Sequence, residues 1–108
     1  MDAKEQSLKD ELVALQEKLQ DPSIYSDPTY PKLAKRQAYL EDVIRLLKER
    51  HSLQASYKSA SELVNSDDEL AEMAQEELLE TEAALVINET RLIEALTPKD
   101  PKDEKDVI

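Results

Sequence analysis

Apolar residues recur at helical spacing in the first part of the chain. Four leucines follow one another at steps of three or four residues, which places them on one face of a helix: Leu8, Leu12, Leu15 and Leu19. Charged residues occupy the other faces, and Pro22 disfavours helical geometry in the residue before it. The pattern therefore predicts a first helix over residues 3–20.

The longest periodic stretch predicts a second helix over residues 31–65. Its apolar stripe contains three leucines seven residues apart: Leu33, Leu40 and Leu47. A helix of this length would extend about 50 Å at 1.5 Å per residue. The serines between His51 and Ser61 are weaker helix formers, so a kink or loose stretch, if there is one, is expected there.

A third helix is predicted over residues 66–96. Ser66 and Glu69 have the spacing of a capping box, in which each side chain bonds to the backbone N–H of the other residue. Two apolar heptad repeats follow side by side, one formed by Leu78, Leu85 and Leu92 and the other by Leu79, Val86 and Ile93. An apolar face of this width is suited to contact two neighbouring helices.

Three helices with short connections predict an all-α fold, an elongated up-down-up antiparallel three-helix bundle. The second and third helices are expected to form a long hairpin that the first helix covers only in part. We assign residues 1–96 to this domain. Residues 97–108 combine Pro98 and Pro101 with alternating charges, and we expect them to form a linker toward a catalytic core outside this chain.

The composition of the 108 residues excludes several kinds of site. There is no glycine, so the glycine-rich loops that bind phosphates and dinucleotides are absent, and there is no cysteine for disulfides or zinc thiolates. His51 is the single histidine and is expected on a helix flank. No group of residues forms a catalytic pattern, and we expect no catalytic residue, no cofactor and no metal site.

The net charge of −11 is concentrated in residues 66–108. Residues 66–108 contain fourteen acidic and four basic residues. Eight acidic residues and no basic one lie between positions 67 and 82: Asp67, Asp68, Glu69, Glu72, Glu76, Glu77, Glu80 and Glu82. Such a run is either a solvated helix start, favoured by the helix dipole, or a docking face for a basic protein surface.

The docking interpretation gains weight because Lys58 is the only base expected near these acids. Its candidate residues are Glu72, Glu76, Glu80, Asp67 and Asp68. The same charge opposes binding to bare nucleic acid or to an anionic membrane surface.

Three segments of the chain resemble the N-terminal domain of bacterial class-1 peptide chain release factors. The first is Asp-Pro-Ser-Ile-Tyr at 21–25 with Tyr-Pro-Lys-Leu-Ala-Lys at 30–35. The second is Asp-Asp-Glu-Leu-Ala-Glu-Met-Ala-Gln-Glu-Glu-Leu at 67–78, and the third is Leu-Thr-Pro-Lys-Asp-Pro-Lys-Asp at 96–103. The last two segments and their mutual spacing are the specific part of a resemblance that covers essentially the whole chain.

This resemblance implies a domain that acts at the ribosome. We expect a cytoplasmic location, because the acidic and polar start of the chain lacks the apolar core of a secretory signal, and a monomer, because the prolines and caps favour a bundle within one chain. The expected partners are the proteins of the ribosomal stalk base, with the GTP-dependent class-2 release factor as a further candidate. The sister type, which reads UAA and UGA, usually carries a Phe-Trp pair in its first helical connection. This chain has neither residue, which favours the type that reads UAA and UAG. The codon-reading and Gly-Gly-Gln regions of the family lie downstream of this domain.

Two other interpretations remain open from the sequence. The heptads also fit an unrelated coiled coil that acts as a protein-interaction module or scaffold, although the prolines and caps favour a bundle within one chain. A small helical enzyme is the third alternative, and no residue pattern supports it.

Overall fold

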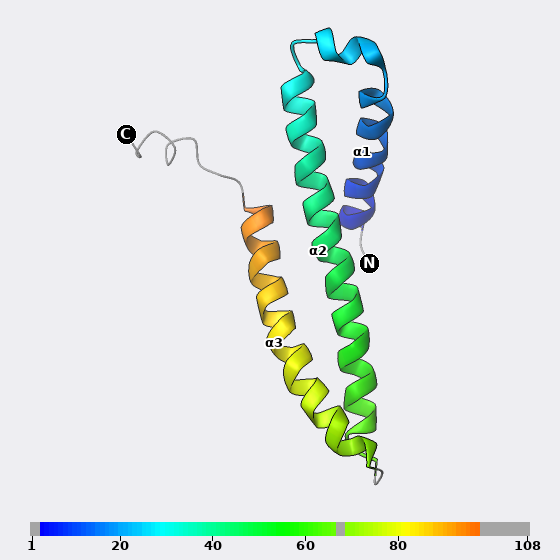
Figure 1. Ribbon diagram of the computed structural model, residues 1–108, viewed down its shortest axis with the longest axis vertical. Coiled ribbons are helices and arrows are strands. Elements are labelled where there is room, and N and C mark those ends of the chain that lie inside the picture. The colour runs from blue at the N-terminus through cyan, green and yellow to red at the C-terminus, as the bar shows by residue number, and fades with distance from the viewer. Residues whose placement is uncertain (1–2, 67–68, 98–108) are drawn as a thin grey trace, which may run out of the picture.

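The computed structural model describes residues 3–66 and 69–97, which form an all-α fold (Figure 1). Within these residues the elements are α1 (Ala3–Leu19), the 3₁₀ helix η1 (Pro22–Ser26), α2 (Tyr30–Leu63) and α3 (Leu70–Leu96). Asp67, Asp68 and positions 98–108 of the predicted linker lie outside the described residues. None of the described helices is long and apolar enough to cross a membrane.

Two aspartates shape the connection between α1 and α2. The Asp21 carboxylate accepts a hydrogen bond from the backbone N–H of Ser23 at 3.0 Å and so caps η1. The Asp27 carboxylate accepts the backbone N–H of Thr29 at 2.8 Å and its hydroxyl at 2.7 Å. Pro31 follows in the first turn of α2, where a missing N–H costs nothing.

Helix α2 is the common partner of the other two helices and runs unbroken for 34 residues, through the serine-rich stretch. Helix α1 lies along its first half, and α3 returns antiparallel along its second half (Figure 1). Because each partner uses a different length of α2, no Cα atom of α1 comes within 8 Å of one in α3 among the described residues.

The core lies at the middle of α2, where the two packing regions meet. One cluster of buried residues contains Val43, Leu46, Leu47 and Leu92. The other contains Leu15, Leu40 and Ile44, and Leu8 of α1 packs against both clusters. The buried leucines therefore come from all three predicted stripes.

The predicted capping box at the start of α3 is wrong. Helix α3 begins at Leu70, not at residue 66, and Glu69 before it makes no side-chain capping bond. The Ser66 hydroxyl instead donates to the carbonyl oxygen of Leu63 at 2.8 Å, at the end of α2. The described bond of the serine therefore lies at the end of the preceding helix.

Helix α3 uses only part of its wide apolar face within the described structure. The face toward α2 combines leucines with a second column of small or polar residues seven apart: Ala74, Thr81, Asn88 and Ala95. The other predicted stripe, Leu79, Val86 and Ile93, is exposed. The expectation that the two stripes contact two helices is therefore wrong among the described residues, because the side chains of the second stripe are exposed.

Candidate functional site

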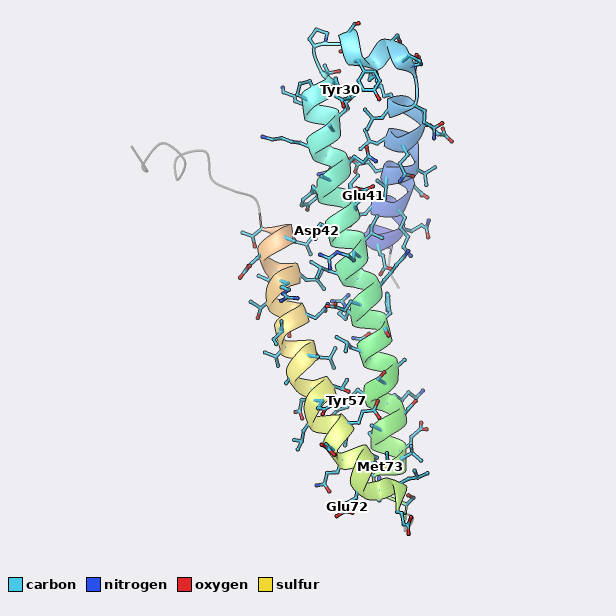
Figure 2. The ribbon with its side chains drawn as sticks, in the orientation of Figure 1. Tyr30, Glu41, Asp42, Tyr57, Glu72 and Met73 are labelled. Atoms are coloured by element: carbon cyan, nitrogen blue, oxygen red, sulfur yellow. The ribbon has the colours of Figure 1, made fainter. Side chains whose placement is uncertain are left out.

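The predicted acidic face is exposed on α3. Glu72, Glu76 and Glu80 lie one helical turn apart, and all three side chains are solvent-exposed. Figure 2 places Glu72 at the end of the hairpin where α2 and α3 join. Of the five predicted docking residues, the structure brings these three onto one side of the helix, while Asp67 and Asp68 lie outside the described residues.

These glutamates have no basic partner within the described residues. Helix α3 carries seven glutamates and a single base, Arg91. The side-chain ion pairs of the described chain join residues of α1 and α2 only: Glu5 with Lys9 and His51, Glu11 with Arg36, and Asp42 with Arg45. Lys58 forms none of these pairs. The negative charge of α3 is therefore directed to solvent without internal compensation.

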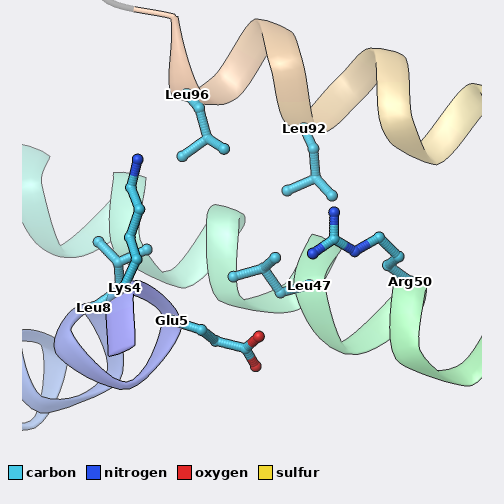
Figure 3. Close-up of a pocket in the computed structure, with 7 residues that line it drawn as sticks. All are labelled: Lys4, Glu5, Leu8, Leu47, Arg50, Leu92 and Leu96. Carbon is cyan, nitrogen blue, oxygen red and sulfur yellow. The ribbon is translucent and has the colours of Figure 1, made fainter. Parts of the chain in front are cut away.

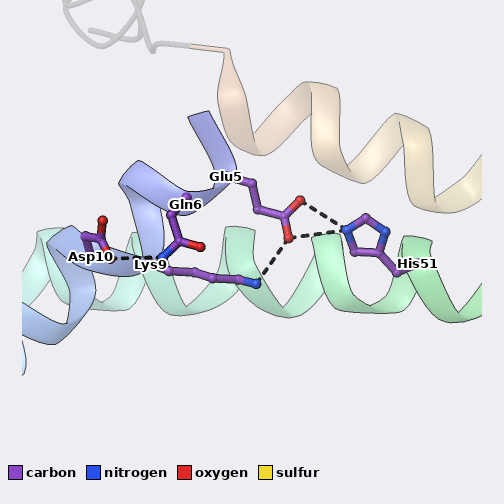
Figure 4. A network of polar contacts seen from close by, with 5 residues as sticks. All are labelled: Glu5, Gln6, Lys9, Asp10 and His51. Atoms are coloured by element: carbon purple, nitrogen blue, oxygen red, sulfur yellow. Dashed lines mark hydrogen bonds and ion pairs between the residues drawn. The ribbon is translucent and has the colours of Figure 1, made fainter. Parts of the chain in front are cut away.

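A polar network sets the position of α1 on α2 (Figure 4). The carboxylate oxygens of Glu5 lie 3.1 and 3.2 Å from Nε2 of His51, and Lys9 Nζ lies 3.3 Å from the same carboxylate. Glu5 is buried, and its hydrogen bond with His51 holds the pKa of its carboxyl below the usual range. An ionised Glu5 thus anchors the start of α1 beside the middle of α2. Sequence reasoning missed this pair, because 46 residues separate its members.

A second link between α1 and α2 is formed by Arg36 and Glu11. The guanidinium Nε and Nη2 atoms donate to the two carboxylate oxygens at 2.5 and 2.8 Å, and Arg36 also lies over the ring of Tyr39. This pairing lowers the pKa of Glu11. Like the Glu5 network, the pair holds two helices together and offers no open site.

A small cavity lies where the three helices meet (Figure 3). Its volume is about 110 Å³, and its lining comes from all three helices: Lys4, Glu5, Leu8, Leu47, Arg50, Leu92 and Leu96. Pockets for small-molecule ligands usually measure about 300–1,000 Å³. No group of three or more potential metal-ligating side chains is present in the described segments. The cavity is thus a packing feature of the junction.

Asn88 is a buried polar residue in the contact between α2 and α3 that sequence reasoning also missed. Its side chain is fully buried, and Nδ2 donates to the Leu46 carbonyl at 3.0 Å and to Oε1 of Glu49 at 2.8 Å. The available signal was its place seven residues after Thr81, in the column of small and polar residues. A polar side chain at such a position fixes the register of two helices.

Comparisons with known proteins show which family this chain is similar to. The sequence profile of the PCRF domain matches residues 8–108. "Peptide chain release factor 1" of Alkaliphilus oremlandii is 34% identical over 105 residues, which cover 94% of this chain and 29% of that protein. The proteins of the same name from Clostridioides difficile and Clostridium botulinum strain Hall are 36% identical over 104 residues and 39% over 97.

The matched regions cover 94% and 87% of this chain in those two comparisons, and 29% and 27% of the respective relatives. The chain thus spans less than a third of the length of the curated relatives that it matches. No solved structure matches it.

Proposed function

The chain belongs to the PCRF domain family, and we propose that it is the N-terminal ribosome-interaction domain of a class-1 peptide chain release factor. The observation that carries the proposal is the exposed, unpaired row of glutamates on α3 in a chain that is similar to release factor 1 proteins over 94% of its length. The helical hairpin holds this row away from the packed core. Such a surface fits contact with another protein better than chemistry on a small molecule.

In this proposal, the whole protein directs translation termination at UAA and UAG, and this domain supplies contacts and no catalysis. Hydrolysis of peptidyl-tRNA would depend on the decoding and Gly-Gly-Gln regions of the factor. The 108 residues contain no glycine and so cannot include the second of these regions.

The proposed partners are basic proteins of the ribosomal stalk base, in the cytoplasm. Glu72, Glu76 and Glu80 would approach them, with Asp67 and Asp68 as further candidates. A surface with this charge is repelled by ribosomal RNA and attracted by basic proteins. The class-2 release factor is a second proposed partner, because the resemblance implies cooperation between the two factors in recycling.

The test is charge reversal in the acidic row, Glu72→Lys, Glu76→Lys and Glu80→Lys together. The fluorescently labelled chain is mixed with ribosomes, and association is followed by stopped flow at low and high salt. Exposed charges act mainly on the encounter, so we expect the variant to associate about tenfold more slowly at low salt, with a smaller difference at high salt.

The matched control reverses three exposed acids of α1 and of the first half of α2, Asp10→Lys, Glu17→Lys and Glu41→Lys. Both variants change the net charge by the same amount, so a difference between them reports the position of the changed charges. Thermal unfolding of both variants verifies that the fold is intact. Equal association rates for the two variants would show that the acidic row is a solvated helix surface and no docking face.

A homo-oligomeric coiled coil is the second candidate, favoured by the exposed heptad stripe of α3. We propose a monomer, because the hairpin already pairs α3 with α2. Sedimentation velocity at several concentrations distinguishes the two: a mass near 12.3 kDa throughout supports the monomer, and a mass that rises with concentration supports the coiled coil.

A further inference from the structure

The exposed stripe of α3 forms an apolar ridge along the helix. Its three side chains, Leu79, Val86 and Ile93, are 66%, 62% and 58% exposed. Steps of seven residues turn an α-helix by only about 20°, so the three side chains stay in line over about 21 Å of helix. Large apolar residues scattered singly over a surface are ordinary, but a row of three on one helix face is not.

Acidic residues border this ridge along both sides. At about 100° per residue, Glu82 and Glu89 lie along one side, and Glu76 and Glu94 along the other. All four are exposed, and none is part of a described ion pair. Arg91, the single base of the helix, lies about 140° away around the helix axis. The ridge is therefore an apolar line between two negative borders.

We infer that this ridge is a docking site for a basic amphipathic helix of a partner protein, one with apolar residues on one face and Lys or Arg on both sides of it. The apolar face would cover the three ridge residues, and the basic residues would meet the glutamates of the borders. The inference goes beyond the proposed function, since it concerns the apolar stripe beside the acidic row and requires no ribosome, although Glu76 belongs to both surfaces.

Charge complementarity selects this occupant over the alternatives. A second copy of the chain, at a net charge of −11, would bring its own glutamates against the same borders, and like charges facing each other are unfavourable. An anionic lipid surface is repelled for the same reason. The ridge alone could bury on the order of a few hundred Å² of its surface in an interface. A standard interface buries roughly 800 Å² per partner, so the charged borders have to contribute to the contact as well.

The test measures direct binding of a defined probe by the 108-residue chain. The probe is a fluorescein-labelled, alanine-based helical peptide with leucines along one face and lysines on both sides of that face. A matched peptide carries glutamates in place of the lysines. Fluorescence anisotropy gives both affinities, and we expect the lysine peptide to bind at least about tenfold more tightly and to weaken with salt.

The ridge variant carries Leu79→Gln, Val86→Gln and Ile93→Gln. The matched control carries Val13→Gln, Met73→Gln and Ile87→Gln, which removes three apolar side chains that are 54%, 68% and 52% exposed and lie outside the ridge. Glutamine is a good helix former, so neither variant should weaken its helix. We expect the ridge variant to lose about tenfold or more in affinity for the lysine peptide, and the control less than about twofold.

Three outcomes would overturn the inference. If the lysine peptide does not bind, or binds the ridge variant as well as the wild type, the ridge is no recognition element. If the wild type self-associates in sedimentation and the ridge variant does not, the occupant is a second copy. The ribosome experiment changes Glu76 of one border and none of the three ridge residues. Ridge-dependent peptide binding together with ribosome association that does not depend on the acidic row would therefore refute the proposed function alone.

Discussion

Leu92→Ala tests the packing between α2 and α3 most directly. The Leu92 side chain is 3% exposed and packs against Val43, Leu46 and Leu47. The change removes three carbon groups, worth about 0.8 kcal/mol each in transfer free energy, and leaves a cavity that the neighbours fill only in part. We therefore expect the free energy of unfolding to fall by about 3 kcal/mol.

The adjacent residue supplies the control. Ile93 is 58% exposed, so Ile93→Ala should change the free energy of unfolding by less than about 1 kcal/mol. Leu85, which shares the leucine heptad with Leu92, is only half-buried and should give an intermediate loss. The three values should therefore follow burial and not side-chain size.

Urea unfolding followed by circular dichroism at 222 nm measures all three variants. An unchanged dependence of the free energy of unfolding on urea concentration would show that the variants differ in stability alone. A loss below about 1 kcal/mol for Leu92→Ala would refute the assignment of the core. So would an equal loss for Ile93→Ala, since α3 would then be rotated relative to the described contact.

Two further predictions concern polar residues between the helices. Asn88→Leu should leave the free energy of unfolding unchanged or raise it by about 1 kcal/mol, because it removes a buried Oδ1 atom that has no hydrogen-bond partner. Asn88→Asp should lower it by about 3 kcal/mol, because it buries a charge beside Glu49. Urea unfolding compares the two variants, and a stabilising aspartate would contradict the geometry. Glu5 has a lowered pKa in the folded state, so below about pH 5 the unfolded state binds more protons than the folded state. The contribution of Glu5 to the free energy of unfolding is therefore complete above that pH and is lost as the pH falls through the lowered pKa. His51→Ala removes the main cause of that shift and should flatten the acid side of the stability profile, and an unchanged slope between pH 3 and 5 would show that the pair contributes nothing.

The sequence predicted the order of the three described α-helices because their apolar repeats are long and regular, whereas the 3₁₀ helix η1 was not predicted. The stripe through Leu40 and Leu47 alone identifies the buried side of α2. The start of α3 was less predictable, since Ser66 has two possible bonding partners and the turn geometry decides between them. The local sequence pattern thus predicts the presence of a helix better than it predicts the residue at which that helix begins.

The parts of the candidate site that depend on helix register were not predictable from the sequence. Glu5 and His51 meet only because the start of α1 lies beside the middle of α2. The acidic row was visible in the sequence, since consecutive acids four residues apart must share a helix side. Its lack of partners became clear only from the structure, in which Arg36 pairs with Glu11 of α1, Arg45 pairs with Asp42 of α2, and no described ion pair reaches the acidic row.

The arrangement of α3 shows that packing against α2 does not use its most apolar side. The side toward α2 pairs leucines with a column that includes Thr81 and Asn88, while the column of Leu79, Val86 and Ile93 is exposed. A rotation of α3 that buried the exposed column would break the two hydrogen bonds of Asn88 to α2. A buried asparagine costs stability and fixes register. The bonds of Asn88 thus hold α3 in an orientation that leaves the ridge and its acidic borders exposed.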